Sequence, residues 1–176
     1  AYRSGVRHDL SGRFNAASAK AKLETPASLT LSVWQQVSDQ WEAMGDLSYT
    51  RWNSVDAFSV LSKTNGNLLS TAGFNLDDAW RLAWGAAYRF SDQGKFKFGF
   101  AYERSAVSSR HRTLHLPEHD RFWLSTGLQW RFNSAQTVDL GYAYRHQREA
   151  PLAVGVVPAK LKRSEHLLGL QYSAGF

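Results

Sequence analysis

Arginine is the residue type in this sequence best suited to bind an anionic ligand, because a guanidinium group holds a carboxylate through two parallel hydrogen bonds. Three arginines alternate with apolar residues and are expected on the polar face of strands: Arg81, Arg131 and Arg145. We predict that they form a basic stripe that binds the carboxylate of a ligand. The alternative is that each pairs with acidic side chains and with water.

Three histidines recur every four residues, at His111, His115 and His119. On a helix this spacing would place the three imidazoles on one face, where they could bind a metal ion. Pro117 would interrupt such a helix, so we expect a histidine-bearing surface loop and no metal site. The sequence has no cysteine, and no cofactor is predicted.

Nucleophilic catalysis would need a serine and a histidine brought together with an orienting group. Ser164, Glu165 and His166 are close in sequence. Neighbouring residues of a strand point to opposite faces, so Glu165 and His166 would not converge. The sequence also lacks the Gly-x-Ser-x-Gly turn of serine hydrolases. We therefore predict that the protein is not an enzyme, and an outer-membrane enzyme such as a lipase is the least favoured alternative.

The elements that must position these residues are indicated by a period of two. From His166 onward, residues of the stretch 161–176 alternate between an apolar face and a small or polar face, as a half-buried β-strand does. The apolar face carries Leu168, Leu170, Tyr172, Ala174 and Phe176. Such a strand, ending on an aromatic residue, is typical of a barrel whose outside contacts lipid.

The same alternation predicts eight strands in all. We expect them at Tyr2–Asn15, Ala27–Gln36, Trp41–Trp52, Asp78–Phe90, Lys95–Arg104, Arg121–Phe132, Thr137–Arg145 and Leu161–Phe176. Long and short connections alternate between them. The long ones are expected at Ala16–Pro26 (a loop), Asn53–Asp77 (with a small hairpin turning at Thr64-Asn65-Gly66), Ser108–His119 and Gln147–Lys160 (a loop).

The sequence contains an internal repeat in which a glycine is followed, three positions later, by an aromatic residue. Gly85 to Gly127, Gly99 to Gly141 and Gly127 to Gly169 are each separated by 42 residues. One repeat corresponds to one hairpin with its connections. We expect the glycines to face inward, where strand backbones crowd, and the aromatic residues to face outward.

These patterns predict an all-β fold, a transmembrane antiparallel β-barrel in the bacterial outer membrane. Aromatic residues make up 14% of the sequence, which suits a lipid-facing surface, and no uncharged apolar run reaches the ~18 residues of a membrane helix. A soluble barrel or sandwich with the apolar face inside is the alternative. The net charge of +6 is scattered along the strands, so no nucleic-acid partner is predicted.

Parts of the sequence resemble the FadL family of outer-membrane transport proteins. The resemblance lies in Pro117-Glu118-His119-Asp120-Arg121-Phe122-Trp123-Leu124-Ser125 with Gly127, in Val37-Ser38-Asp39-Gln40-Trp41 with Leu47, Tyr49, Thr50, Arg51 and Trp52, and in the opening Tyr2-Arg3-Ser4 with Val6 and the closing Phe176.

The resemblance implies a fourteen-stranded barrel, plugged by an N-terminal hatch, that moves long-chain fatty acids or other hydrophobic molecules across the outer membrane. Only the last eight strands are matched. We therefore expect residues 1–176 to be the C-terminal part of such a barrel, without the hatch and the first strands. The expected partners are membrane lipid, a hydrophobic small-molecule ligand and, through the strand ending at Phe176, the outer-membrane assembly machinery.

Two connections are unusually apolar for external loops, which are expected to be polar unless they contact something hydrophobic. They are 68–74 and 151–157, and we predict that Leu152 and Val156 contact the ligand. These segments could equally be extensions of the strands. A structural or adhesive barrel without transport, in which only the loops contact partners, is the remaining alternative.

Overall fold

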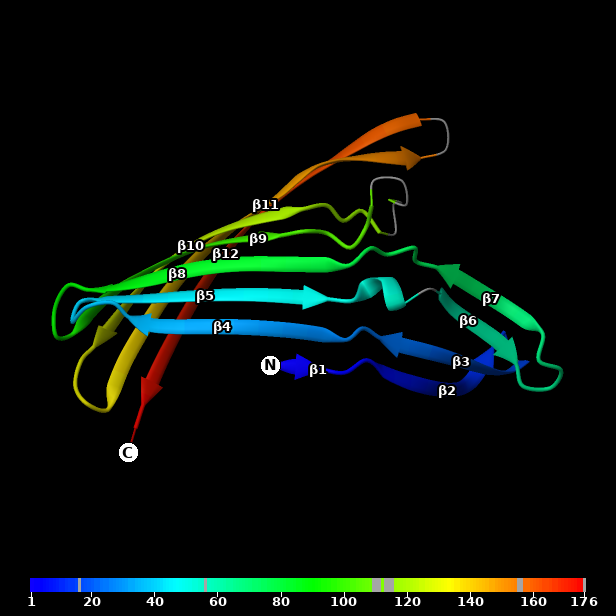
Figure 1. Cartoon of the computed structure of the whole chain (residues 1–176), viewed down its shortest axis with the longest axis horizontal. Helices are drawn as coiled ribbons and strands as arrows, with labels where there is room; N and C mark the ends of the chain where they lie inside the picture. The colour runs from blue at the N-terminus through cyan, green and yellow to red at the C-terminus, as the bar shows by residue number, and fades with distance from the viewer. Residues whose placement is uncertain (16, 56, 109–111, 113–115, 155–156, 176) are drawn as a thin grey trace.

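The structure is a computed structural model that describes residues 1–15, 17–55, 57–108, 112, 116–154 and 157–175, with the backbone alone described for 150–154 and 157–159. Its main element is an eight-stranded antiparallel sheet (Figure 1). In sheet order the strands are β1 (Tyr2–Arg3), β4 (Ser28–Gln36), β5 (Trp41–Thr50), β8 (Ala79–Arg89), β9 (Gly94–Glu103), β10 (Arg121–Arg131), β11 (Gln136–Val154) and β12 (Val157–Ala174). One of these strands overlaps each of the eight predicted segments, so the prediction of antiparallel strands there is confirmed, although four further strands form a second sheet.

The main sheet is strongly twisted, and β11 and β12 run obliquely to β4 and β5 (Figure 1). Over the described residues β1 pairs only with β4 and β12 only with β11. The sheet therefore stays open, with β1 and β12 at its two edges. The described part of the chain contains no helix long and apolar enough to cross a membrane.

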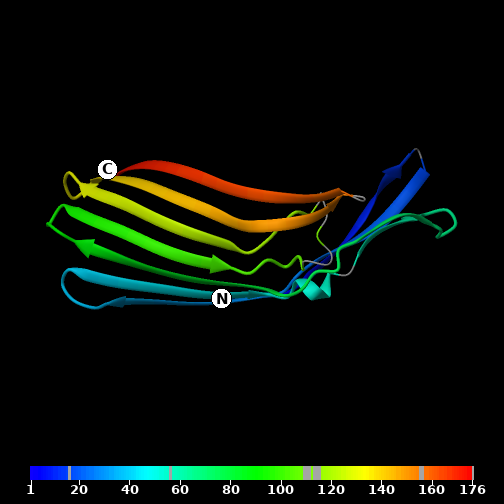
Figure 2. The same ribbon diagram turned by 90° about the horizontal axis from the view of Figure 1, so that it is seen from above.

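A second, four-stranded sheet extends from the end of the main sheet that carries the long connections (Figures 1 and 2). Its order is β2 (Val6–Phe14), β3 (Ala17–Thr25), β6 (Ala57–Ser62) and β7 (Leu68–Gly73). The predicted hairpin around Thr64-Asn65-Gly66 is confirmed, because β6 and β7 pair on either side of it. Gly66 makes this turn possible with a φ of 75°, a conformation that costs glycine little.

Two predictions about connections were wrong. Ala16–Pro26 was expected to be a loop, but Ala17–Thr25 forms β3 and pairs with β2 along its whole length. In this strand alanines on one face alternate mainly with lysines on the other. Because alanine is depleted in strands, this alternation is only a weak strand signal. Gln147–Lys160 was also expected to be a loop, whereas β11 and β12 extend through this segment to Val154 and Val157. The alternative prediction, that these residues extend the two strands, is confirmed for this segment.

The predicted first strand is divided between the two sheets. Tyr2–Arg3 joins the main sheet and Val6–Phe14 joins the small one. The division falls beside Gly5, where a Cβ atom would lie 2.9 Å from the Thr25 carbonyl oxygen. The chain can make this close approach only because the residue has no side chain.

The two faces of the main sheet differ as predicted. Leu168, Leu124 and Trp84 belong to the apolar face and are 81%, 56% and 51% exposed. No large side chain of the described residues is fully buried, so the sheet has no hydrophobic core of the soluble kind. The other face carries the charged residues and the glycines, and a hollow of about 670 Å³ lies against it. We call these the outer and the inner face.

Ion pairs on the inner face reach over intervening strands. Lys95 of β9 binds Glu42 of β5 at 2.5 Å, across β8. Lys97 of β9 binds Asp139 of β11 at 2.8 Å, across β10. The residues beneath are small: Ala87 pairs with both Glu42 and Lys97 in the sheet, and Gly127 lies between β9 and β11. Small inward residues thus leave room for long side chains to lie flat along the wall.

Backbone crowding explains only some of the repeated glycines. A Cβ atom on Gly127 would lie 3.0 Å from the Leu140 carbonyl oxygen, whereas a Cβ atom on its sheet neighbour Gly141 would meet nothing within 4 Å. Gly127 is therefore required by close packing. Gly141 is not, and what it provides is space in the hollow.

Replacing Gly127 by alanine should therefore destabilise the sheet, by about 1 kcal/mol in the free energy of unfolding, because overpacking forces the backbone to shift. Gly141→Ala is the matched control and should be neutral or slightly stabilising, since alanine restricts the unfolded chain. Urea unfolding of the protein in lipid vesicles, followed by tryptophan fluorescence, measures both. Equal effects of the two substitutions would contradict this account of the glycines.

Candidate functional site

A pocket of about 570 Å³ lies at the long-connection end of the main sheet. The small sheet, the short 3-10 helix η1 (Trp52–Ser54) and the connection 104–120 all contribute to its wall. Its apolar lining consists mainly of Leu23, Trp52, Val55, Phe74, Leu76 and Val107. We call it the mouth pocket.

Part of the wall of the mouth pocket is made by two connections that pair with each other. Leu76, after β7, forms an isolated antiparallel bridge with Val107, after β9. The Asp77 amide donates a hydrogen bond of 2.8 Å to the Ala106 carbonyl. Val107 and Val55 are both buried. Short apolar side chains from otherwise polar connections therefore converge on one place.

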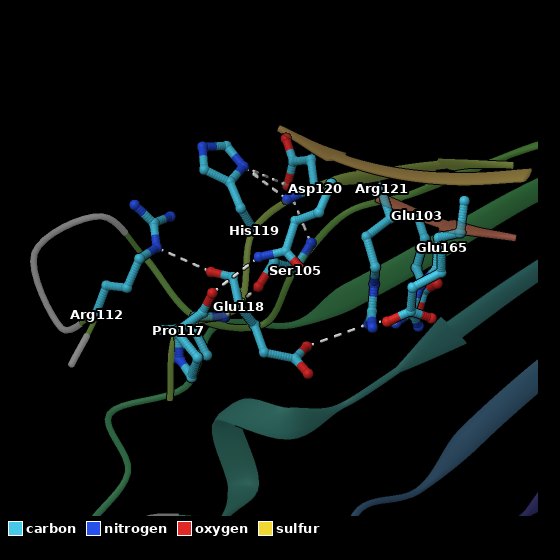
Figure 3. Close-up of polar contacts among 12 residues, drawn as sticks. Glu103, Ser105, Arg112, Pro117, Glu118, His119, Asp120, Arg121 and Glu165 are labelled. Carbon is cyan, nitrogen blue, oxygen red and sulfur yellow. Dashed lines mark hydrogen bonds and ion pairs between the residues drawn. The ribbon is translucent and has the colours of Figure 1, made fainter. Parts of the chain in front are cut away.

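Three charged residues in the wall of the mouth pocket bind one another. Arg121 Nη2 donates hydrogen bonds to Glu103 Oε1 at 3.0 Å and to Glu118 Oε2 at 3.1 Å (Figure 3). Ion pairs and backbone hydrogen bonds of this kind lower the cost of placing charge beside an apolar surface. The arrangement can hold an apolar molecule by surface burial, with polar groups at one side of it.

The connection 104–120 is held over the pocket by Asp120. Its Oδ2 accepts a hydrogen bond of 2.8 Å from the Tyr102 hydroxyl, and its Oδ1 accepts one of 3.0 Å from the Ser105 amide. The Asp120 carbonyl accepts a third from the Arg148 amide at 3.0 Å. The same motif recurs at Asp78, which accepts hydrogen bonds from the Tyr49 hydroxyl and the Asn53 amide. In both of these connections an aspartate therefore accepts a hydrogen bond from a tyrosine of the outer face.

Further contacts fix the same connection (Figure 3). The buried Arg112 donates through Nε to the Glu118 carbonyl at 2.8 Å. Gln147 of β11, also buried, donates through Nε2 to the Pro117 carbonyl at 2.8 Å. This connection, which contributes to the pocket wall, is therefore bonded to β11 as well as to itself.

His119 is in its neutral form near pH 7. Burial lowers the pKa of His119, the charge of Arg112 lowers this pKa further, and Asp120 opposes the shift. Its Nδ1 accepts a hydrogen bond of 2.6 Å from the Asp120 amide, which requires an unprotonated Nδ1. Protonation of the imidazole would remove this acceptor from the junction between the connection and β10.

The structure does not gather the three predicted arginines into one group. Arg145 contacts Glu165 and lies 5.2 Å over the Trp123 ring. Arg81 is exposed on β8 and faces Glu103 of β9 across the sheet. Arg131 ends β10, ten residues from Arg121, which is about 33 Å along a strand. Arg81 and Arg145 lie near the mouth pocket, and Arg131 lies at the opposite end of the sheet. Binding of a carboxylate by any of them stays a prediction.

The other predicted residues are placed as follows. The backbone of Leu152 lies in β11, where it pairs with Ala159, while Val156, His111, His115 and Phe176 lie outside the described residues. Within the described residues no three His, Asp or Glu side chains form a group that could hold a metal ion. Glu165 bonds Arg145 on the inner face, and His166 bonds the Tyr142 hydroxyl at 2.7 Å on the outer face. The prediction that these two neighbours cannot converge is confirmed.

Sequence reasoning missed most of the mouth pocket. Val55, Leu76 and Val107 stand singly in the connections, without periodicity. The only signal in the sequence is that isolated apolar residues interrupt polar segments at 55, 76 and 107. Arg121 was expected within a strand, but its role in joining Glu103 to Glu118 depends on the fold of the connection before it.

Several known proteins are similar to this chain. It is 30% identical over 154 residues to the long-chain fatty acid transport protein of Escherichia coli (strain K12). The aligned region covers 88% of this chain and 34% of that protein. It is 31% identical over 119 residues to outer membrane protein P1 of Haemophilus influenzae, covering 68% of this chain and 26% of that protein. The chain thus spans about a third of the length of the first of these relatives.

Solved structures show the same fold. A Pseudomonas aeruginosa FadL homologue superposes with a TM-score of 0.79 at 24% identity, over 90% of this chain and 37% of that one. The Pseudomonas putida toluene transporter TodX superposes with a TM-score of 0.63 at 18% identity, over 98% and 42%. A family model described as outer membrane protein transport protein (OMPP1/FadL/TodX) matches residues 1–176. The resemblance predicted from the sequence is therefore confirmed, and the chain belongs to this family of outer-membrane β-barrel proteins.

Proposed function

We propose that this chain forms the part of an outer-membrane β-barrel through which hydrophobic small molecules enter, and that the mouth pocket receives them first. The observation that carries the proposal is an apolar pocket at the end of the sheet with the long connections, beside a hollow along the inner face. Arg81 lines the hollow, and its neighbours in the same cross-strand row, Glu103 and Arg121, line the pocket. The two spaces thus adjoin on one wall.

The energetics of such an entry are favourable at the pocket. Burying each methylene of an alkyl chain contributes about 0.8 kcal/mol, so a few methylenes in the mouth pocket suffice for weak capture. Beyond it, the inner wall offers polar groups already bonded to each other, such as Lys97 with Asp139 and Gln129. A molecule moving along this wall breaks none of these contacts, and the small residues leave it room.

The relatives define the substrate classes to compare. One is named for long-chain fatty acids and a structural neighbour for toluene. We propose either a long-chain fatty acid or a hydrophobic aromatic compound as the transported molecule, moved without catalysis. We further propose that the complete protein supplies the remaining strands and the hatch, which is supported by the unpaired edges of β1 and β12 over the described residues. A structural or adhesive barrel would have no need of an apolar pocket.

Phe74→Ala should weaken capture, because it removes an aromatic surface from the mouth pocket without altering a strand of the main sheet. We expect binding of a fluorescent long-chain fatty acid to the complete protein in lipid nanodiscs to weaken about tenfold, the value of some 1.4 kcal/mol of lost contact. Phe132→Ala, on the outer face at the short-turn end, is the matched control. Unchanged binding in Phe74→Ala would remove the pocket from the mechanism, and a toluene probe run in parallel would separate the two substrate classes.

The β11–β12 hairpin provides a second test. We propose that Leu152 and Val156 contact the incoming molecule, so Leu152→Asp combined with Val156→Asp should reduce uptake of a labelled fatty acid by cells that carry the complete protein. Charged groups on this hairpin would oppose transfer of an apolar molecule from water. Wild-type uptake by the double variant would exclude the hairpin from capture.

Capture should also depend on pH through His119. The pKa of His119 in the folded protein is below its ordinary value. The contribution of the neutral imidazole to binding affinity is therefore complete above about pH 6.5 and is lost as the pH falls through the lowered pKa. We expect the affinity for an uncharged hydrophobic probe to decrease between pH 7.5 and pH 5. His119→Asn, which keeps an acceptor near the Nδ1 position at every pH, should flatten the profile. The same profile in both proteins would argue against His119 as the cause.

A further inference from the structure

Aromatic side chains on the outer face form a row near the external end of the main sheet. The rings of Trp80 and Tyr102 lie 5.2 Å apart, and those of Tyr102 and Phe122 lie 5.0 Å apart. The row continues at Tyr144, whose ring is 5.1 Å from that of His166. Aromatic residues of outer-membrane barrels gather where the acyl chains meet the headgroups. The row therefore marks the level at which the headgroups of the external leaflet begin.

Basic residues lie beyond this row, two residues past Tyr102 on β9 and four residues past Tyr144 and His166 on β11 and β12. Arg104 follows Tyr102 by two residues, and its amide bonds the Trp80 carbonyl. In the register of the sheet, Arg104, Asp120 and Arg148 follow the cross-strand row of Glu103, Arg121 and Gln147. On β12, Lys162 lies opposite the bulge formed by Arg148 and Glu149, because the register shifts between Gln147 and Ala150. Adjacent strands are about 4.8 Å apart, so Arg148 and Lys162 are close neighbours and Arg104 lies about 10 Å from Arg148.

These three cations are available to an external partner. All three are exposed, and none has an ion pair among the residues that the structure describes. The acidic residue between them, Asp120, already accepts hydrogen bonds from Tyr102 and Ser105. The nearby Glu149 pairs with Lys160 at 2.7 Å. Arg104 and Arg148 both lie within electrostatic range of the Tyr102 side chain, which places them at the outer face of the aromatic row.

From this arrangement we propose that Arg148 and Lys162, with Arg104 beside them, bind the phosphate groups of a phosphorylated lipid of the external leaflet. Guanidinium and ammonium groups are the side chains that bind phosphate most strongly, the guanidinium through paired hydrogen bonds. Cations at the headgroup level of a membrane attract anionic lipid in proportion to their number. The acyl chains of the same lipid would cover Phe122 and Leu124, which are exposed on the outer face below.

The two ends of such a lipid fit the surface in the correct order. The aromatic and aliphatic side chains lie toward the middle of the sheet, and the cations lie toward its external end. A free anion would use only the second of these features, whereas a lipid would use both. The bound lipid would also contact β12 at the edge of the described sheet, and it would hold the β11–β12 hairpin upright beside the mouth pocket.

The test uses the complete protein, purified in mild detergent and mixed with lipid A that carries two phosphates or one, and the retained lipid is counted by native mass spectrometry. We expect the doubly phosphorylated form to be retained preferentially, and Arg148→Gln combined with Lys162→Gln to lower its retention roughly tenfold. The matched control is Arg13→Gln with Lys20→Gln, two exposed cations of the small sheet, which should retain wild-type amounts.

Three outcomes would overturn the proposal. They are equal retention in the double variant and the control, equal retention of the two forms of lipid A, and full displacement of the lipid by millimolar inorganic phosphate, which would indicate a site for the free anion. Because the double variant could fold poorly, Arg148→Lys with Lys162→Arg is measured beside it. That protein keeps both charges and should retain the lipid, and its failure to do so would also contradict the assignment.

Discussion

The period of two along each strand is the constraint on which the structure depends. In hydrocarbon no water can satisfy a backbone amide or carbonyl, so a sheet must pair these groups between strands and leave only side chains to meet the lipid. From β4 to β12 the main sheet does so by antiparallel pairing, with one register shift in β11 between Gln147 and Ala150. Residues such as Leu168 and Leu170, which would be unfavourable on a soluble protein, are therefore placed where exposure to acyl chains stabilises them.

The same constraint shapes the inner face. Each strand contributes every second residue to the lumen, and small residues alternate there with long charged ones. Lys95 and Lys97 extend across a neighbouring strand to reach Glu42 and Asp139 because Ala87 and Gly127 leave the way open. The charges thus cancel within the wall. The proposed passage of an apolar molecule along this surface would meet no unpaired charge to be stripped of water at these positions.

Alternation in the sequence was enough to predict the eight strands of the main sheet and the division between its faces. It could not give the height of a residue along the barrel, which is why Arg131 was grouped with Arg81 and Arg145 although it lies at the other end of the sheet. It also could not find β3, where alanines weaken the contrast between faces. Val55, Leu76 and Val107 converge only through the pairing of connections, and no local pattern reports such contacts.

The aromatic row on the outer face is not perpendicular to the strands. Tyr102 lies two residues nearer the short-turn end than Trp80, Phe122 is level with Tyr102, and Tyr144 lies two residues nearer again, as the register of β8 to β11 shows. Four residues, with a rise of about 3.3 Å each, over three strand spacings of about 4.8 Å correspond to strands leaning by roughly 40°, within the range of outer-membrane barrels. A level bilayer surface therefore crosses β11 and β12 well before their hairpin end. The described pairs from Ala150 and Leu161 to Val154 and Val157 lie past the lipid as a hydrogen-bonded ribbon, which borders one side of the proposed entrance.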